Sequence, residues 1–316
     1  MKPETAEGDR AAADTRKGLA YAVSAYSLWG LLPVYWKALG GVGALEILAH
    51  RTAWSLVFVS AVLVIRRDWR WRAVIQARPR LLLIFLGSGA ILATNWLTYI
   101  WGVNSGQIVE TSLGYFINPL MYVLLGVIVL HERMGRAQVM AVGLAAAGVL
   151  YLTVNHGSFP WIAMTLATTF ALYGLLRKIA PLGALEGLAV ETAALCVPAA
   201  VYIAYLGHQG SGSFASESHG CSLLLLMSGC VTAFPLLLFT AGARRLPLAT
   251  VGILQYIAPT LQLLLGVLVY REPFGGVRAV GFGFVWCALL LYTADGLVRW
   301  RRGAKRHRKY GVGTNP

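Results

Sequence analysis

The sequence predicts an all-α integral membrane protein whose ten transmembrane helices form two inverted repeats of five helices. Its composition is the first observation: 57% of the 316 residues are hydrophobic and 13% are charged, with a mean hydropathy of +0.64. Soluble domains carry about 25% charged residues, so lipid is the expected solvent. The other two observations are long apolar runs and a sequence pattern that recurs in the second half of the chain.

The apolar runs are long enough to cross a bilayer, which takes about 20 residues in a helix. Residues 81–103 and 222–243 contain no charged residue. Glycine, proline and charged clusters separate successive runs and mark the connections. The expected spans are 18–39, 44–65, 81–103, 108–130, 137–154, 159–179, 184–206, 222–243, 248–270 and 277–297.

The basic residues predict the orientation of these spans. If the N-terminus is cytoplasmic, 23 of the 27 Lys and Arg residues fall on the cytoplasmic side, three fall outside, and Arg51 lies within a span. Short cytoplasmic loops are enriched in Lys and Arg, so we expect a multi-pass protein of the inner (plasma) membrane with both termini cytoplasmic. Residues 1–17 and the basic stretch 298–316 are the expected tails. The net charge of +14 therefore reflects topology and lipid contact, and no nucleic-acid partner is expected.

Several other classes of protein and site are disfavoured. The first apolar run is too long for the core of a cleavable signal peptide. The four cysteines (Cys196, Cys221, Cys230 and Cys287) form no C-x-x-C pattern, so we expect neither a disulfide nor a metal site. The phosphate-binding pattern G-x-x-x-x-G-K-[ST] is absent, which leaves direct ATP use unsupported. We expect no catalytic residue and no cofactor.

An internal repeat divides the chain. Residues 43–53 and 183–193 share a glycine, Ala-Leu-Glu, Leu-Ala and Thr-Ala at equivalent positions. The same offset relates three later pairs of motifs, namely Ser88-Gly89 with Ser228-Gly229, Pro119 with Pro259, and Gly126 with Gly266. The predicted repeats are 18–154 and 159–297. Because each holds five helices, an odd number, the second copy is inverted in the membrane, an arrangement typical of secondary transporters with a substrate site near the midplane.

Arg51 is the most informative polar residue. A charge near the bilayer centre costs about 2.5–3.5 kcal/mol, so it needs a partner or a wet cavity. Its counterpart in the second repeat is Glu191, and each lies eight residues beyond the matching glycine. At 1.5 Å per residue, both lie about 12 Å deep from opposite faces. We expect them to pair or to share a cavity, either as a structural ion pair or as a substrate or proton site.

His50 and Glu46 lie beside Arg51 on the same span. They are four residues apart and therefore share a helix face. A histidine next to a carboxylate is a candidate for proton coupling because it titrates near neutral pH. A hydrogen bond at the helix end is the alternative role for Glu46.

Further polar and aromatic side chains are candidates for lining a solute site. In the third span Asn95, Trp96 and Tyr99 suit a cavity for organic molecules; hydrogen bonding between helices with lipid-facing aromatics is the alternative. Pro119 and Pro259 predict kinks at matching positions, and paired broken helices mark transporter sites, although a packing role for the kinks remains open. The candidates near these prolines are Tyr115, Asn118, Gln255, Tyr256 and Gln262.

The fifth span is rich in small residues between Gly143 and Gly148. Small residues let helices approach closely. The stretch suits packing within the chain or a homodimer.

Several motifs resemble one family. They are Glu46-x-x-x-His50-Arg51-x-x-Trp54-Ser55, Asn95-Trp96, Ser112–Leu120, Tyr173–Lys178 and Gln255–Pro259. Together they resemble the RarD group of permeases, which are chloramphenicol-sensitivity proteins in the drug/metabolite transporter (EamA) superfamily. The likeness covers about residues 17–297 and leaves out the basic tail and the 207–220 loop. It implies ten helices in two EamA repeats, a plasma-membrane location, and movement of drugs or metabolites whose identity is generally not established.

The expected function is secondary transport of a small organic solute by alternating access of the two repeats, with the lipid bilayer as the surrounding partner. A non-transporting membrane sensor or scaffold is one alternative. An integral-membrane enzyme acting on lipid is another, but it needs His, Asp or Glu clustered at a membrane face, and the acidic residues of the spans are few and scattered. Solute flux would separate the carrier from both.

Overall fold

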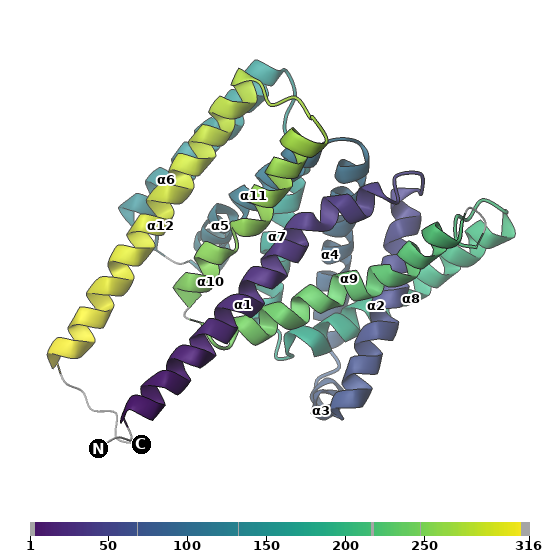
Figure 1. Cartoon of the computed structure of the whole chain (residues 1–316), viewed down its shortest axis with the longest axis horizontal. Coiled ribbons are helices and arrows are strands. Elements are labelled where there is room, and N and C mark those ends of the chain that lie inside the picture. Colours follow the sequence, from purple (N-terminus) through teal and green to yellow (C-terminus); the bar gives the residue numbers. More distant parts are fainter. Residues whose placement is uncertain (1–3, 68, 132, 216–217, 247, 311–316) are drawn as a thin grey trace.

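A computed structural model describes residues 4–67, 69–131, 133–215, 218–246 and 248–310, and within these residues the chain forms helices and short connections without strands (Figure 1). The elements are α1 (Glu4–Lys37), α2 (Ala44–Arg66), α3 (Arg70–Ala77), α4 (Leu81–Asn104), α5 (Ile108–Leu130), α6 (Arg136–His156), α7 (Trp161–Ile179), α8 (Ala184–His208), α9 (His219–Ala243), α10 (Leu248–Leu254), α11 (Ile257–Leu264), the π-helix η1 (Leu265–Val269) and α12 (Gly276–Tyr310).

Eight helical segments of the described residues are long and apolar enough to cross a membrane. They are Ala44–Arg66, Leu81–Asn104, Ile108–Val129, Arg136–Asn155, Ala184–His208, His219–Ala243, Thr250–Val269 and Gly276–Gly296. The other two expected spans, 18–39 and 159–179, are also largely helical, as parts of α1 and α7, but they are not among these eight. The chain is therefore an all-helical, multi-pass membrane protein.

The helices are arranged so that pairs far apart in sequence pack together. α6 and α12 run alongside each other at one side of the molecule, and the α8–α9 hairpin lies at the opposite side (Figure 1). Between them, α2 packs on both α8 and α9, α7 packs on α4 and α5, and α1 packs on α9 and α11. The start of α1 and the end of α12 lie at the same side of the molecule (Figure 1).

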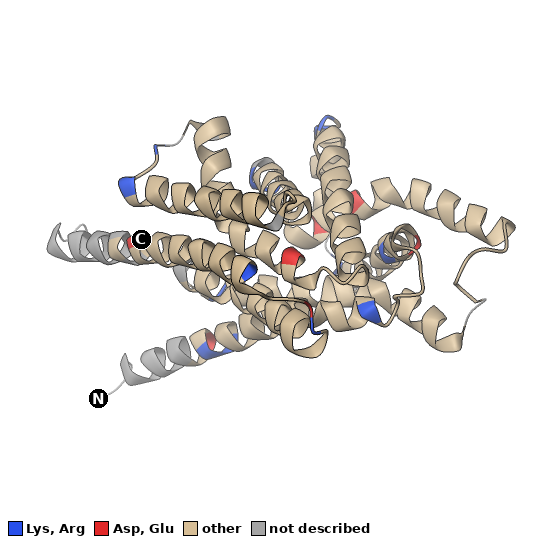
Figure 2. Ribbon diagram, turned by 90° about the horizontal axis from the view of Figure 1, so that it is seen from above, with Lys and Arg blue, Asp and Glu red and all other residues tan. Residues whose placement is uncertain are grey.

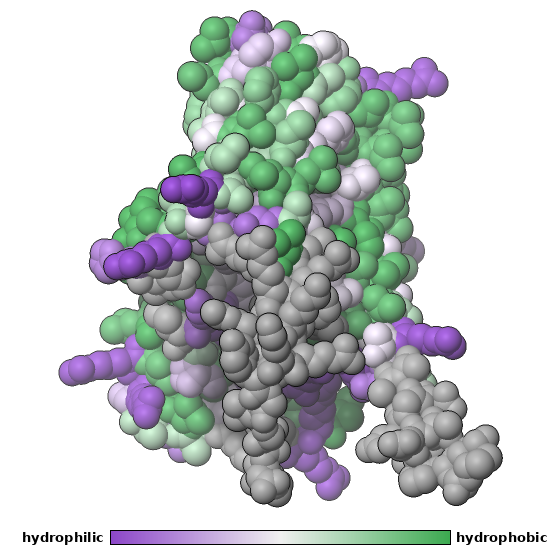
Figure 3. Space-filling model, turned by 90° about the vertical axis from the view of Figure 1, so that its left-hand side faces the viewer, coloured by the Kyte–Doolittle hydropathy of each residue, from purple (hydrophilic) through white to green (hydrophobic). Residues whose placement is uncertain are grey.

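The outer surface of this bundle is apolar. Large side chains such as Ile65 (80% exposed), Leu83 (70%) and Leu290 (71%) point away from the protein. Figure 3 shows hydrophobic side chains over the upper part of the face that carries α6 and α12, with hydrophilic ones gathering lower down. Charged residues are sparse along the helices (Figure 2). Such a surface is suited to contact with lipid and not with water.

Two helical features differ from the sequence expectations. The stretch 66–80, expected to be a basic loop, contains α3, whose Trp71 packs against a cluster that includes Leu63. A helix of eight residues is too short to give a clear period in the sequence. α1 and α12 also extend past the expected spans, to Glu4 and Tyr310, because the charged tails continue the helices.

The small residues of α6 are used within the chain. A Cβ on Gly148 would lie 2.7 Å from Cβ of Phe284 on α12, so the two helices are in close contact there. Ala141 and Ala145 are buried in the same interface, whereas Ala146 and Ala147 remain exposed. The packing role is therefore present, and the exposed alanines leave a homodimer as a prediction.

The spans that contain Pro119 and Pro259 behave differently. α5 continues through Pro119 without interruption, while the equivalent span is broken at Gln255 and Tyr256 into α10 and α11. Pro259 is the third residue of α11, where a missing N–H costs no helical bond. The structure thus has a break next to Pro259 and a continuous helix through Pro119, and the kinks at the two prolines stay predictions.

Candidate functional site

The candidate site is a group of buried polar and aromatic side chains around Arg51. Arg51 lies in the second turn of α2, is 5% exposed, and donates a hydrogen bond from Nε to Oγ1 of Thr232 on α9 (2.8 Å). Its guanidinium carbon lies 3.9 Å from the ring centroid of Trp96 and 5.0 Å from that of Trp36. α1, α2, α4 and α9 thus all contribute to the enclosure of one cation.

A close helix contact brings Thr232 to Arg51. Gly229, one turn earlier on α9, faces the backbone of α2, and a Cβ there would lie 2.3 Å from the carbonyl carbon and oxygen of Trp54. Only glycine permits this approach. The Ser-Gly motif that the sequence repeats at 88–89 and 228–229 is therefore a helix-packing element.

Tyrosines surround the guanidinium at greater distance. Tyr35, Tyr99 and Tyr115 all lie near Arg51. The rings of Tyr99 and Tyr115 are in edge contact, with centroids 5.6 Å apart. Tyr99 is 2% exposed, as its predicted inward orientation requires, and its hydroxyl has no hydrogen-bond partner within the described part of the chain.

Glu191 has its own set of partners, so no direct ion pair with Arg51 is present among the described residues, and the alternative of a shared cavity stays a prediction. The Glu191 carboxylate accepts hydrogen bonds from Ser88 (2.7 Å) and Tyr173 (3.2 Å), and it forms an ion pair with Arg177 (3.9 Å). The predicted depth of the two charges carries no information about which face of the helix each one occupies.

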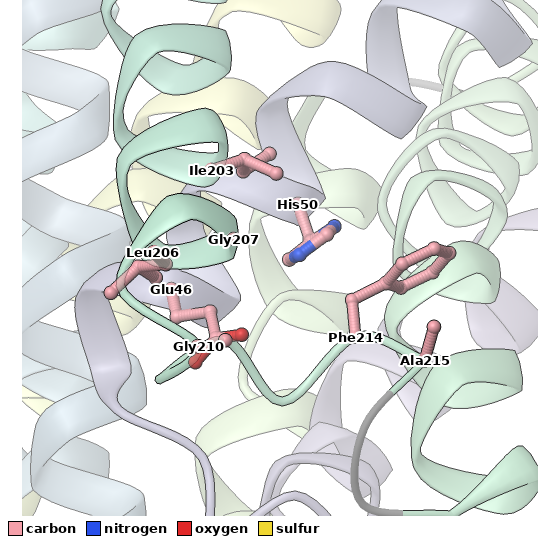
Figure 4. Close-up of a pocket in the computed structure, with 9 residues that line it drawn as sticks. Glu46, His50, Ile203, Leu206, Gly207, Gly210, Phe214 and Ala215 are labelled. Carbon is pink, nitrogen blue, oxygen red and sulfur yellow. The ribbon is translucent and has the colours of Figure 1, made fainter.

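His50 and Glu46 line a cavity of about 280 Å³ between α2, α8 and the segment 209–215 (Figure 4). The Glu46 carboxylate accepts hydrogen bonds from N–H (2.6 Å) and Oγ (3.1 Å) of Ser213. The His50 ring stacks on Phe214, with centroids 5.0 Å apart at 24°. The two residues do share a helix face, as predicted. Glu46 holds the segment 209–215 in place, in line with the alternative role considered for it, a hydrogen bond at the end of the helix.

The remaining amide candidates hold helices together. Asn95 donates from Nδ2 to the carbonyl of Leu166 (3.1 Å) and to Thr169 (2.9 Å), which links α4 to α7. Gln262 donates to the carbonyl of Trp29 (3.2 Å), which links α11 to α1. Asn95, Asn118 and Gln262 each keep a buried side-chain oxygen without a partner among the described residues. For Asn95 and Gln262 the geometry favours interhelix bonding.

Two other candidates lie away from Arg51. Gln255 is half-buried at the break between α10 and α11. Tyr256 packs on the core cluster of α5, α6 and α12 and hydrogen-bonds Thr293. Neither contacts the Arg51 enclosure among the contacts described.

Several site residues were not predicted from the sequence. They are Trp36, Ser88, Tyr173, Arg177, Ser213, Phe214 and Thr232. Arg177 counted as a cytoplasmic loop residue, yet its side chain is 13% exposed and pairs with Glu191. The recurrence of Ser88 and Ser228 marked the right helix faces, but nothing in the sequence marked Trp36 or Phe214.

Comparisons with known proteins agree with this architecture. Residues 16–154 match the EamA-like transporter family. Protein RarD of Streptomyces exfoliatus is 46% identical over 293 residues, covering 93% of each chain. The uncharacterized transporter YojE of Bacillus subtilis is 46% identical, covering 93% of this chain and 99% of the relative.

A more distant relative is the chloramphenicol-sensitive protein RarD of Pseudomonas aeruginosa, which is 33% identical over 92% of this chain and 98% of its own. One protein crystal structure superposes with a TM-score of 0.56 at 20% identity, covering 91% of this chain and 99% of that one, which shows a shared fold. The enclosed polar centre in an all-helical membrane protein and these relatives lead to one conclusion: the chain belongs to the RarD group of the EamA-like family, whose members are membrane transporters of the drug/metabolite type.

Proposed function

We propose that the protein is a secondary carrier that moves small organic molecules across the cell membrane by alternating access between two inverted five-helix repeats. The repeats are 18–154 and 159–297, which gives ten spans with both termini in the cytoplasm. The observation that carries this proposal is that exchanging the two halves maps the most extensive helix pairs onto one another.

The offset that relates Gly43 to Gly183 equates α1 with α7, α2 with α8, α4 with α9, α5 with α10–α11, and α6 with α12. The contacts of α1 with α9 and α11 then correspond to those of α7 with α4 and α5, and α2 on α9 corresponds to α8 on α4. The pairs α2–α8, α6–α12 and α5–α11 map onto themselves. A two-fold axis in the membrane plane generates such a pattern.

The polar centre follows the same exchange. Arg51 on α2 bonds to α9 just after Gly229, and its counterpart Glu191 on α8 bonds to Ser88 on α4, just before Gly89. The buried charge of each half is thus hydrogen-bonded to a side chain of the other half. Two related packings of the same halves have similar energies, which is what a carrier needs to face either side in turn.

The cavity beside His50 supports a closed outer gate. With the N-terminus inside, the start of α2 and the segment 209–215 lie at the outer face. The bonds from Ser213 to Glu46 and the stacking of Phe214 on His50 fasten this segment over the cavity. Arg51 lies five residues past Glu46, about 7.5 Å deeper along the helix. Releasing the segment opens a path toward it.

Flux in proteoliposomes tests the carrier. Uptake of radiolabelled chloramphenicol, amino acids and nucleosides is measured with and without unlabelled solute inside the vesicles; chloramphenicol is included because one relative is named for sensitivity to it. A carrier accelerates exchange when solute is present on both sides. Uptake equal to that of empty vesicles for every solute would favour a sensor or scaffold.

The gate is tested with the double variant Glu46→Cys/Ser213→Cys, in a background where the four native cysteines are replaced. A short, reducible bis-methanethiosulfonate reagent should link the two sites, stop flux, and release it again on reduction. Each single variant treated with the same reagent serves as the matched control and should keep the flux that it shows without the reagent. Unchanged flux in verified, fully linked protein would contradict an outer gate at this point.

A further inference from the structure

Three polar groups of the Arg51 enclosure lack a hydrogen-bond partner within the described part of the chain. Arg51 Nη1, Trp36 Nε1 and the Tyr99 hydroxyl are all buried and have no partner among the described residues. Arg51 is 5% exposed, Trp36 is fully buried and Tyr99 is 2% exposed. Unsatisfied buried polar groups are rare in folded proteins and call for a specific explanation.

The charge is also unmatched. Within the described residues no Asp or Glu forms an ion pair with Arg51, and Glu191 is already paired with Arg177. The rings of Trp96 and Trp36 stabilise the cation in part. They leave the N–H groups of Nη1 without an acceptor, and a buried cation without an anion is costly in a low-dielectric environment.

We propose that Arg51 binds the carboxylate of a small organic acid that carries an aromatic or other planar group. A carboxylate is a strong acceptor for guanidinium N–H groups, which matches the unpartnered Nη1. The ring would then lie against Trp96, Tyr99 and Tyr115. This assignment rests on the proposed carrier function and names the substrate class of that same site.

Charge balance favours a single carboxylate over other ligands. Arg51 supplies one positive charge, which neutralises one carboxylate and leaves a phosphate dianion with an excess charge. A cationic solute would be repelled, and a neutral solute would leave the guanidinium uncompensated. An anion bound to a cation of the protein forms a neutral pair within the site, which lowers the cost of burying either charge.

Calorimetry on the purified full-length protein in detergent tests the assignment. The ligands are 3-phenylpropionate, its neutral amide, 3-phenylpropylamine and phenyl phosphate, which share a phenyl group and differ in charge. The carboxylate should bind the wild type about tenfold or more tightly than the amide, as expected for a charge-assisted pair. The amine should not compete with it.

Variants assign that preference to one residue. Arg51→Gln should remove the difference between carboxylate and amide, while Arg51→Lys should keep part of it. Arg72→Gln, which removes the same charge from an exposed position, is the matched control and should bind as the wild type does. Circular dichroism and thermal unfolding identify any variant that fails to fold, in which case Arg51→Lys carries the test.

Equal affinity for carboxylate and amide would overturn the inference, and so would a carboxylate preference that survives in folded Arg51→Gln. No detectable binding of any of the ligands at a concentration of about 1 mM would overturn it as well. Tighter binding of phenyl phosphate than of the carboxylate would also contradict it. The carrier function fails separately, since carboxylate binding without flux would leave the subsite correct and the transport wrong. Flux that does not change when Arg51 is replaced would leave the transport correct and the subsite wrong.

Discussion

Arg177 and Glu191 form an ion pair across α7 and α8, with Nη1 and Oε1 3.9 Å apart, and the Glu191 side chain is only 1% exposed. Ser88 and Tyr173 complete the set of partners for the carboxylate. Glu191 is therefore held inside the second repeat and bonded to α4, which leaves the Arg51 guanidinium as the free charge of the polar centre.

Breaking this pair should destabilise the protein more when one partner is removed than when both are. Arg177→Gln leaves a buried carboxylate without its cation and should cost about 3 kcal/mol of unfolding free energy. Arg177→Gln/Glu191→Gln should cost less than that, because no charge is left unpaired. A double-mutant cycle from unfolding in detergent measures the coupling; additive losses would argue against a functional ion pair.

Thr232 should be needed for its hydroxyl and not for its shape. Thr232→Val leaves Arg51 Nε without its 2.8 Å partner and should lower stability by about 1.5–3 kcal/mol, the range for hydrogen bonds to charged groups. Thr232→Ser keeps the hydroxyl and is the control. Thermal unfolding of the two variants side by side decides the matter, and an equal loss in both would point to packing instead.

Gly229 should not tolerate a side chain. In Gly229→Ala the new Cβ would lie 2.3 Å from the Trp54 carbonyl on α2, so the helices must separate, at a cost of about 1–3 kcal/mol. Gly87→Ala is the matched control, because a Cβ at Gly87 meets nothing within 4 Å. Unfolding midpoints should fall for the first variant only. A similar midpoint for both variants would contradict the close α2–α9 contact.

Glu272 should act as the N-terminal anchor of α5. Its two carboxylate oxygens accept from the N–H groups of Ile108 (2.7 Å) and Val109 (2.8 Å), where the helix dipole favours a negative charge. Glu272→Gln replaces one acceptor with a donor and should cost about 1–3 kcal/mol. Hydrogen exchange at the start of α5 should accelerate.

Glu186→Gln provides the control for Glu272. Glu186 also lies in the first turn of a helix, α8, but it makes no hydrogen bond among the contacts described. Its substitution should change exchange at the start of α5 very little. Equal acceleration in both variants would mean that loss of charge alone, and not the double hydrogen bond, explains the effect.

Much of the fold was accessible from the sequence because lipid imposes a simple rule. Each expected span is covered by helix, since backbone polar groups in hydrocarbon must bond within the segment. The breaks, boundaries and short elements were less accessible. The interruption at Gln255 and the helix α3 depend on local packing against other helices, which hydropathy does not record.

For the site, the sequence identified the helices but not the partners of the buried residues. It singled out Arg51, Glu191 and Tyr99 as buried polar residues and related Arg51 to Glu191 by the repeat. It could not assign Thr232 or Trp36 to Arg51, or Arg177 to Glu191, because those contacts depend on the rotation and close approach of helices distant in sequence.

By itself the sequence determined that this chain belongs in a membrane, which stretches are helical, and that its two halves repeat at one constant offset. These properties follow from the amino-acid composition and from the spacing of apolar runs and repeated motifs, which can be found from the sequence alone. Tertiary structure alone decided that Arg51 faces Thr232 and two tryptophans while Glu191 faces Arg177. The physical reason is that a side chain's partner is set by how two helices pack, and that packing depends on small contacts such as Gly229 against Trp54.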